Sequence, residues 1–537
     1  MKALSFLRLA GSIALGLGLC VQSASAGSAT WDLNPATNSW TTPENWTPAT
    51  VPNGPTDVAT FGAGSTAEIS LAAPTSAPLA LTLDSLVFSS NAVFYIIDVS
   101  KGLSSTQLVF VGGGIINFTN LQDNINLGGG TGIVFSNAAA ADNLYFTLSG
   151  STASDPATSS ITFQNNAAAV SMDIDVLGSA SAAPGNAGAS ASFLDNSDAG
   201  TAAVIAFGGQ VDGAAGGMIL FDGSANLNRG AAAAFGGTAT DALGATAIFQ
   251  GQATAGSGFV GAGGGTAGGA PGSLFFKDDS DGGTANLFPS GGVVDISEHN
   301  PPGVTVGAFA GSGTVYLGSN NLTTGAPEVS TSGFDGTILD GGAGGGTGGS
   351  FTCGGGVVLT RASTYTGGTT VDGGGGLRLA APSGSAVGSG PVQIFNGTLS
   401  GTGSILNTVI VGTGSGPKAW LMPEFIGRAT LTIRKNVVFN ADATYITYLS
   451  SKPRIASKAS ARGVRIQSGA TIDAELAQGS RTLPSGVVYT VLENTSTLAT
   501  VGTFANLPDG GTIIVGDRTL QANYEGGDGN DLTLTVQ

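Results

Sequence analysis

Short apolar stretches that end in phenylalanine recur along the middle of the chain. They end at Phe135, Phe163, Phe193, Phe221, Phe249 and Phe276, so the successive spacings are 28, 30, 28, 28 and 27 residues. Each stretch is followed by a turn-forming run of Gly, Ala, Ser, Asn and Asp, such as the one that begins at Leu194. No helical period of 3.6 residues with capping signals competes with this pattern. Short strands separated by turns at a fixed period indicate a solenoid.

A right-handed parallel β-helix explains the repeat physically, and we therefore predict an all-β fold of this kind. Each coil would place its strands about 4.8 Å above those of the previous coil, with backbone hydrogen bonds running between coils. The phenylalanines from Phe163 to Phe276 should then stack inside the solenoid as one ladder. Charged residues make up only 10% of the chain, as expected where like charges would lie on top of one another.

The two atypical ends of the chain are expected to cap the solenoid, because an open terminal coil is an exposed sheet edge. Trp31, Trp40 and Trp46 lie close together near the N-terminus. Such rings can bind sugar faces or plug the first coil, and we favour the plug. The sequence divides into a signal peptide (1–26), a Trp-rich N-terminal cap (27–62), Gly/Ala-rich coils with a period of about 28 (63–350), a distinct repeat (351–405) and a C-terminal β cap (406–537).

Residues 1–26 read as an export signal. Lys2 and Arg8 precede an apolar run, and Ala24-Ser25-Ala26 fits a cleavage site. Cleavage would remove Cys20 and leave Cys353 alone, which precludes an intrachain disulfide and a zinc site of four cysteines. No later run offers the ~20 apolar residues of a membrane-spanning helix. We expect an exported protein that is extracellular or associated with the outer surface.

Charge is distributed unevenly along the chain. Residues 27–360 contain 3 bases and 24 acids, a net charge of −21, whereas residues 361–537 contain 13 bases and 11 acids, a net charge of +2. The acidic part would repel phosphates, so nucleic acid is not an expected partner. Five bases gather in the C-terminal part: Lys452, Arg454, Lys458, Arg462 and Arg465. They form either a solvated strand face, the reading we favour, or a contact for an extracellular polysaccharide or protein.

A resemblance to a known family rests on residues 354–379, which read GGGVVLTRASTYTGGTTVDGGGGLRL. The stretch from Thr364 to Val371 resembles the centre of the autotransporter-associated β-strand repeat. The N-terminal pattern of Trp40, Asn45, Trp46, Pro52, Asp57 and Phe61 and the segment after Val501 are similar to the ends of such proteins. The resemblance implies a secreted bacterial β-helix passenger and no catalytic residues. The sequence ends without the alternating strands of a translocator barrel, so another export route is expected.

Candidate catalytic groups are few, and each has a structural explanation. Asp278, Asp279 and Asp281 form the densest acid cluster, but it recurs at the repeat period and therefore indicates a turn. His299 is the single histidine and precedes a Pro-Pro turn. Cys353 is expected to be a small buried residue. A lyase would need a base beside acids, and the acidic part has three bases.

The segment from Gly526 to Asp531 matches the start of a calcium-binding nonapeptide, yet it occurs once, whereas that site needs stacked copies. We interpret it as a turn before the last strand. We therefore assign no catalytic, cofactor-binding or metal-binding residues and expect no cofactor. The expected function is that of a secreted or cell-surface structural, adhesin-like β-helix protein without catalytic activity. The alternative is a polysaccharide-active β-helix enzyme, either a lyase or a glycoside hydrolase.

Overall fold

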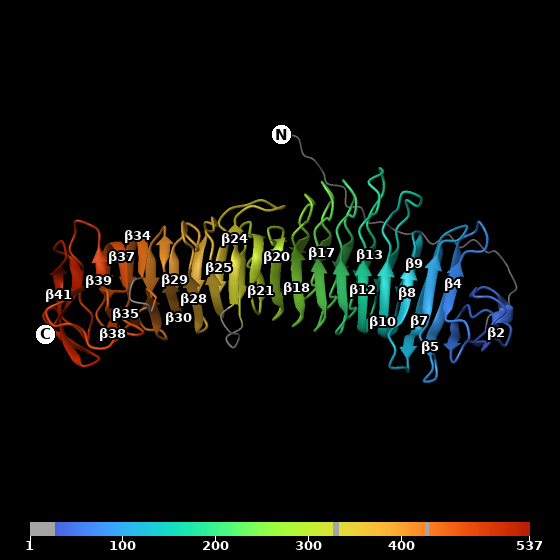
Figure 1. Ribbon diagram of the computed structural model, residues 1–537, viewed down its shortest axis with the longest axis horizontal. Coiled ribbons are helices and arrows are strands. Elements are labelled where there is room, and N and C mark those ends of the chain that lie inside the picture. The colour runs from blue at the N-terminus through green and yellow to red at the C-terminus, as the bar shows by residue number, and fades with distance from the viewer. Residues whose placement is uncertain (1–26, 326–331, 425–428) are drawn as a thin grey trace.

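The chain forms a long rod of stacked β-strands (Figure 1). The computed structural model describes residues 27–325, 332–424 and 429–537, and the expected signal peptide with Cys20 lies outside them. The described part is all-β apart from the short 3-10 helix η1 (Pro43–Asn45). Its strands pair in parallel from coil to coil and build a parallel β-solenoid of about 16 turns, as the repeat predicts.

One row of parallel strands runs through nearly the whole rod. In its N-terminal half it contains β3 (Gly54–Phe61), β5 (Leu79–Phe88), β7 (Thr106–Asn117), β9 (Thr131–Phe135), β11 (Ser160–Phe163), β13 (Ser190–Phe193), β15 (Met218–Phe221), β17 (Thr246–Phe249) and β19 (Ser273–Phe276). It continues through β20 (Asn286–Asp295), β22 (Gly311–Tyr316), β24 (Ser332–Leu339), β26 (Gly356–Leu359), β28 (Gly375–Leu379), β30 (Gly397–Gly401), β33 (Ala419–Met422), β35 (Ala443–Ser451) and β38 (Thr471–Leu476). We call it the first row.

A second row accompanies the first as far as β20. It contains β4 (Glu68–Ala72), β6 (Ile96–Ser100), β8 (Asp123–Leu127), β10 (Ala140–Leu148), β12 (Ala168–Val176), β14 (Ala203–Ala206), β16 (Ala231–Ala234) and β18 (Phe259–Gly263). A third row begins beyond it with β21 (Gly303–Val306), β23 (Asn321–Thr324), β25 (Ser350–Cys353), β27 (Gly368–Val371), β29 (Val392–Ile394), β32 (Val409–Val411), β34 (Thr430–Phe439) and β37 (Lys458–Ile466). The short β31 (Gly403–Ile405) also pairs with β34.

The recurring phenylalanines form one internal stack in the first row, as predicted from their spacing. Ring centroids from Phe135 to Phe276 lie 4.6–5.2 Å apart, and Phe110 extends the stack at 5.0 Å. In the middle of the stack the rings are within 6° of parallel, and all are buried. Backbone pairing brings each ring directly over its copy, because the register matches Phe163 with Phe193 and Phe193 with Phe221.

The turn after each phenylalanine also stacks on itself. Its second residue has a positive φ in successive coils, near 60° at Asn165 and Asp195 and 55° at Asp278. Asn and Asp tolerate this left-handed conformation better than other residues with a Cβ. The Asp195 carboxylate accepts a hydrogen bond from the backbone amide of Asn165 in the coil before it, at 2.9 Å. The acids at this position are therefore parts of stacked turns.

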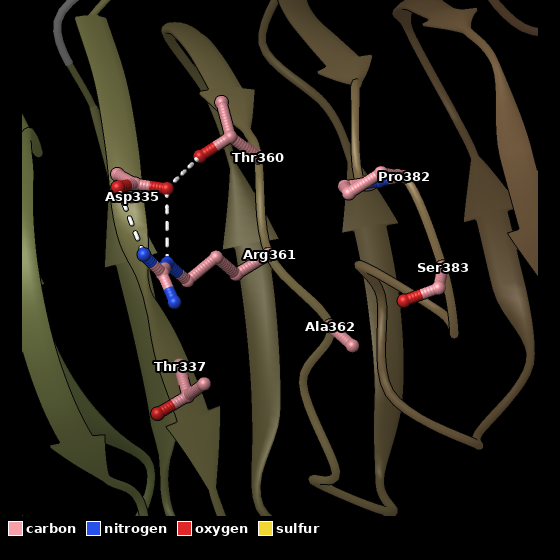
Figure 2. Close-up of a pocket in the computed structure, with 7 residues that line it drawn as sticks. All are labelled: Asp335, Thr337, Thr360, Arg361, Ala362, Pro382 and Ser383. Carbon is pink, nitrogen blue, oxygen red and sulfur yellow. Dashed lines mark hydrogen bonds and ion pairs between the residues drawn. The ribbon is translucent and has the colours of Figure 1, made fainter.

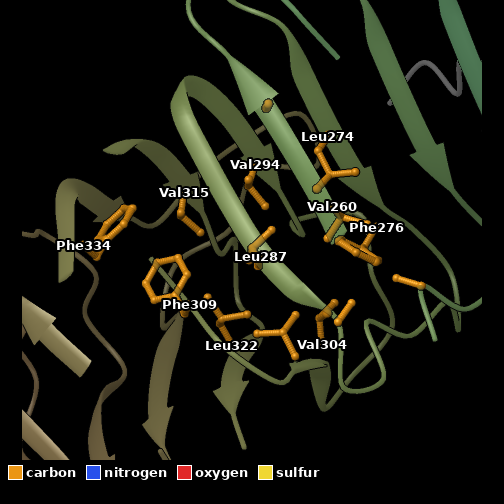
Figure 3. Packing of buried hydrophobic residues seen from close by; sticks show 14 of the residues in the cluster. Val260, Leu274, Phe276, Leu287, Val294, Val304, Phe309, Val315, Leu322 and Phe334 are labelled. Carbon is orange, nitrogen blue, oxygen red and sulfur yellow. The ribbon is translucent and has the colours of Figure 1, made fainter. Parts of the chain in front are cut away.

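The packing of aromatic rings in the core changes at β20. The N-terminal half of β20 pairs with β18 and its C-terminal half pairs with β19, so the second row ends there while the first row continues. Beyond Phe276 the phenylalanine stack gives way to aliphatic side chains and then to Phe309 and Phe334, whose rings lie 4.3 Å apart (Figure 3). The even spacing of the phenylalanines ends at this transition.

The N-terminal cap is a cluster of buried indole rings. β1 (Ala29–Trp31) pairs antiparallel with β2 (Trp46–Thr47) and parallel with β3, which begins the solenoid. The rings of Trp31, Trp40 and Trp46 lie 5.6–5.8 Å from the ring of Phe61 and are almost fully buried. They plug the first coil, as we favoured over sugar binding.

The C-terminal end closes the rod by reversing strand direction. Parallel pairing continues through β37 and β38, so the first part of the predicted 406–537 segment is built of coils. The closing strands β39 (Val488–Asn494), β42 (Asp531–Val536), β41 (Arg518–Gly526) and β40 (Thr512–Val515) then pair antiparallel in this order. A separate hairpin joins β35 to β36 (Arg454–Ala456). The reversal leaves a short strand at the end of the third row, which limits edge pairing.

Replacement of Phe221 by Ala should destabilise the surrounding coils by about 3–5 kcal/mol, because a buried ring is lost between two stacked neighbours. In a solenoid each coil contacts its neighbours, so the loss should be local. Hydrogen exchange of the amides in β13, β15 and β17 measures it. Phe275→Ala, on the outward side of β19, is the matched control and should change exchange much less. Equal effects of the two changes would show that the internal stack carries no special stabilisation.

Candidate functional site

The predicted acid cluster lies in a turn next to the single histidine. Asp278 adopts the left-handed turn conformation, and Asp279 accepts a hydrogen bond from the Asn300 side chain at 2.9 Å. The ring nitrogens of His299 contact the carbonyl oxygens of Ser280, at 2.5 Å, and of Asn300. His299 therefore joins two successive turns through their backbones, which is a structural role.

The two other sequence candidates also have structural surroundings. Cys353 is buried in the core, its thiol donates to the Gly355 carbonyl, and burial raises its pKa to about 11, which disfavours the thiolate. Gly526 and Asp531 face each other across the turn between β41 and β42, as predicted. The Asp531 carboxylate accepts the backbone amide of Asn494 at 2.8 Å. The described residues include no group of three or more His, Cys, Asp or Glu arranged to hold a metal ion.

The five bases of the predicted cluster do not form one surface in the structure, and a further base, Arg434, lies beside two of them. Lys458 forms an ion pair with Glu493 at 2.8 Å, and Lys452 lines a different hollow together with Arg481. Arg462 and Arg465 are exposed on β37 and line one shallow hollow of about 320 Å³.

Arg434 on the neighbouring strand β34 lines a second hollow together with Arg462. We call Arg434, Arg462 and Arg465 the basic patch. The expected five-residue cluster is not one surface, because strand pairing brings together residues that are distant in the sequence.

An open hollow of about 470 Å³ lies beside the middle of β24, where the chain leaves β26 and β28 (Figure 2). Arg361 and Asp335 form an ion pair in its lining, with Nε and Oδ1 3.0 Å apart, and the Thr360 hydroxyl donates to the same Asp335 oxygen at 2.7 Å. The hydrogen bond from Arg361 holds the pKa of Asp335 below its usual value. Asp335 therefore remains an ionised, paired carboxylate, and it is poorly suited to act as a general acid.

A row of carboxylates that the sequence analysis missed lies on the outward face of the second row of strands. Asp173 and Asp175 alternate with buried Met172, Ile174 and Val176 on β12, so both point outward. Their Cα atoms should be about 6.6 Å apart, two residues along one strand. The alternation in SMDIDV could have revealed them.

Hydroxyl and amide groups from neighbouring coils bind these carboxylates. The Tyr145 hydroxyl donates to Asp175, and this hydrogen bond raises the pKa of Tyr145 to about 12. The Gln122 side chain donates to Asp173 at 2.9 Å, and Asn126 donates to Asp98 at 2.8 Å. We call Asp98, Asn126, Tyr145, Asp173 and Asp175 the polar row. Such a surface offers many hydrogen-bond acceptors to a ligand that can donate.

Asp123 is a buried carboxylate at the start of β8, beside Gln122. It accepts the backbone amide of Tyr95 at 2.6 Å and the Asn117 side chain at 3.1 Å. Burial nevertheless raises its pKa to about 6, since desolvation penalises the charged form.

The comparisons with known proteins do not name a family. No protein-family model matches the chain, and no curated protein matches it. Among the described residues, no helix is long and apolar enough to cross a membrane.

The raised pKa of Asp123 predicts a pH-dependent stability. The unfolded chain would titrate near 3.8 and the folded chain near 6. The folded state therefore binds the proton more tightly, and this stabilisation is present below about pH 3.8 and lost as the pH rises through about 6. Relative to Asp123→Asn, the wild-type free energy of unfolding should fall by roughly 3 kcal/mol from about pH 3.5 to about pH 7. Denaturant unfolding at a series of pH values measures the difference, and a constant difference would contradict it.

Proposed function

We propose that this chain is an exported, surface-associated structural or adhesive protein without catalytic activity of its own. We further propose that it belongs to the autotransporter-associated β-strand repeat family. The observation that carries the proposal is the placement of its chemical groups. Charged and polar side chains gather on open outward surfaces of a regular rod, where they can contact large partners.

The local structure of residues 354–379 supports the family assignment. The stretch forms one coil through β26, β27 and β28, and Tyr365 is fully buried in it. The Tyr365 hydroxyl lies 2.6 Å from the Thr369 hydroxyl, and burial raises the pKa of Tyr365 well above its usual value. Thr366 donates to the Asp340 carboxylate of the preceding coil at 2.6 Å. The Tyr and Thr residues of the repeat thus have packing and hydrogen-bonding roles, which fits a structural motif.

The basic patch supports contact with an anionic partner, such as an acidic extracellular polysaccharide. Arg434, Arg462 and Arg465 project from two adjacent strands near the C-terminal end of the rod. Residues 27–360 carry a net charge of −21, so they would repel the same partner. Attraction is therefore confined to the C-terminal third.

The alternative function, a polysaccharide-active enzyme, is favoured by one observation. Asp173 and Asp175 form a carboxylate pair on one strand face, with Cα atoms about 6.6 Å apart, and glycoside hydrolases use a pair of carboxylates on either side of the scissile bond. Against it, the pair lies on an outward strand face, and one oxygen of each carboxylate already accepts a hydrogen bond, from Gln122 or from Tyr145. We keep it as the second candidate.

Exchange of Arg434, Arg462 and Arg465 for Ser should weaken binding to polygalacturonate by about tenfold at low salt, because the attraction is electrostatic. Wild-type binding should also weaken as salt rises above about 0.15 M. The matched control exchanges Lys452, Arg454 and Arg481 for Ser, which removes the same charge elsewhere. Surface plasmon resonance measures both variants. Equal binding by the two variants would show that the basic patch is a solvated strand face without a specific partner.

The enzyme alternative predicts product release that depends on the carboxylate pair. We expect no new reducing ends and no unsaturated sugar ends when the wild type is incubated with a panel of polysaccharides. Activity that disappears in both Asp173→Asn and Asp175→Asn, with hydrogen exchange unchanged, would overturn our proposal and establish the alternative. Asp279→Asn serves as the control for a carboxylate outside the pair.

A further inference from the structure

Three exposed phenylalanines lie close together on the outer surface of the rod, in contrast to the buried rings of the internal stack. Phe235, Phe259 and Phe288 are 43%, 38% and 41% exposed and line one shallow slot of about 260 Å³ on the second row of strands. The ring of Phe235 lies 5.9 Å from that of Phe207, and the ring of Phe259 lies 6.0 Å from that of Phe288. We call Phe235, Phe259 and Phe288 the aromatic platform. Exposed apolar surface gathered in one place is characteristic of binding sites.

Two glycines allow these rings to lie flat on the sheet. A Cβ added at Gly263 would lie 2.6 Å from Cδ1 of Phe235, and one added at Gly261 would lie 3.1 Å from Cε1 of Phe259. The outward positions of β18 beneath the rings therefore have to be free of side chains. Gly261 and Gly263 therefore contribute backbone to the lining of the slot, and the three rings stay exposed.

The aromatic platform and the polar row lie on one continuous face. From β12 toward the C-terminal end of the rod, the strand register pairs Asp175 with Ile205, Ile205 with Ala233, and Ala233 with Gly261. The adjacent line runs from Tyr145 through Asp173, Ala203 and Ala231 to Phe259.

Apolar residues, Ala203 and Ala231 in one line and Ile205 and Ala233 in the other, thus separate hydrogen-bond acceptors at one end from aromatic rings at the other. Asn286 and Ser290, exposed on either side of Phe288, add polar groups beside the platform. A ligand that lies along this face would meet apolar and hydrogen-bonding surfaces in turn.

We propose that this face binds an extended neutral glycan that lies along the rod axis. Pyranose rings present C–H faces that pack on aromatic rings, and their hydroxyls donate hydrogen bonds to carboxylates, which can only accept when ionised. An acyl chain has no donors for Asp173 and Asp175. An anionic glycan, or the same region of a second copy, would meet the net charge of −21 carried by residues 27–360. The neutral glycan fits both halves of the face.

This inference deepens the adhesive role proposed above and rests on it, because it names a ligand for the rod. The glycan would be a separate ligand from the anionic partner of the basic patch. The two sites use different residues and opposite electrostatics, so each can fail without the other. Binding to the platform should be nearly independent of salt, whereas binding to the basic patch should not.

The test is binding of the full chain to an array of immobilised neutral oligosaccharides, followed by calorimetric titration with the best binder. Combined Phe235→Ser, Phe259→Ser and Phe288→Ser should weaken binding by about tenfold or more, since the stacking surface is removed. The matched control replaces three other exposed phenylalanines, Phe94, Phe118 and Phe395, by Ser and should bind as the wild type does. Gly263→Ala, which keeps every ring but displaces that of Phe235, should also weaken binding.

Four outcomes would overturn the proposal. The first is failure of the wild type to bind any neutral oligosaccharide, and the second is equal binding by the platform and control variants. The third is platform-dependent binding to phosphatidylcholine vesicles in place of glycans, which would assign the face to a lipid. The fourth is a wild-type dimer, detected by sedimentation, that becomes a monomer in the platform variant and stays a dimer in the control variant. That result would assign the face to contact with a second copy. Salt-sensitive binding to polygalacturonate through the basic patch would persist in all four if the proposed function holds.

Discussion

The fold depends on parallel backbone pairing between coils, which fixes their separation at about 4.8 Å. At that distance every side chain lies over the residue at the same position of the next coil. Inside the rod, stacked phenylalanine rings 4.6–4.8 Å apart satisfy this spacing, because it is close to the contact distance of two aromatic faces. In the turns, Asn165 and Asp195 bridge consecutive coils through their side chains and backbones. The low charge of the chain follows from the same constraint.

The constraint also organises the outer surface. Alternate residues of each strand point outward. Each outward residue lies over the residue at the same position of the neighbouring coil, so the outward residues form lines parallel to the rod axis. Asp173 and Asp175 on β12, and Phe259 and Gly261 on β18, belong to two such lines. A ligand surface on this rod is therefore a strip parallel to the axis, and an extended polymer matches it better than a compact molecule does.

The sequence predicts the part of the fold that repeats and misses the part that does not. The phenylalanine stack follows from even spacing, and the indole plug follows from three tryptophans near one end. The end of the second row at β20 leaves no such signal, because it depends on one long strand that pairs with two neighbours. The basic patch was missed because the predicted cluster contained only bases close together in sequence, whereas Arg434 is 28 residues, or one coil, from Arg462 and meets it through the pairing of β34 with β37. The aromatic platform was missed because Phe235, Phe259 and Phe288 do not share one position of the repeat.

The aromatic platform with the polar row, and the basic patch, lie in different parts of the rod and suit different ligands. The acidic N-terminal two thirds carry neutral aromatic rings and hydrogen-bond acceptors, while the excess of bases is confined to the C-terminal third. If acidic and basic residues were mixed on every coil, ion pairs would form between neighbouring lines of side chains, as Glu493 pairs with Lys458. Such pairs would neutralise both the acidic face and the basic patch. Separation along the axis keeps Arg434, Arg462 and Arg465 open to an anionic partner. It also keeps a polyanion away from the face that holds Phe235 and Asp175, so one rigid rod can present two chemistries to different polymers.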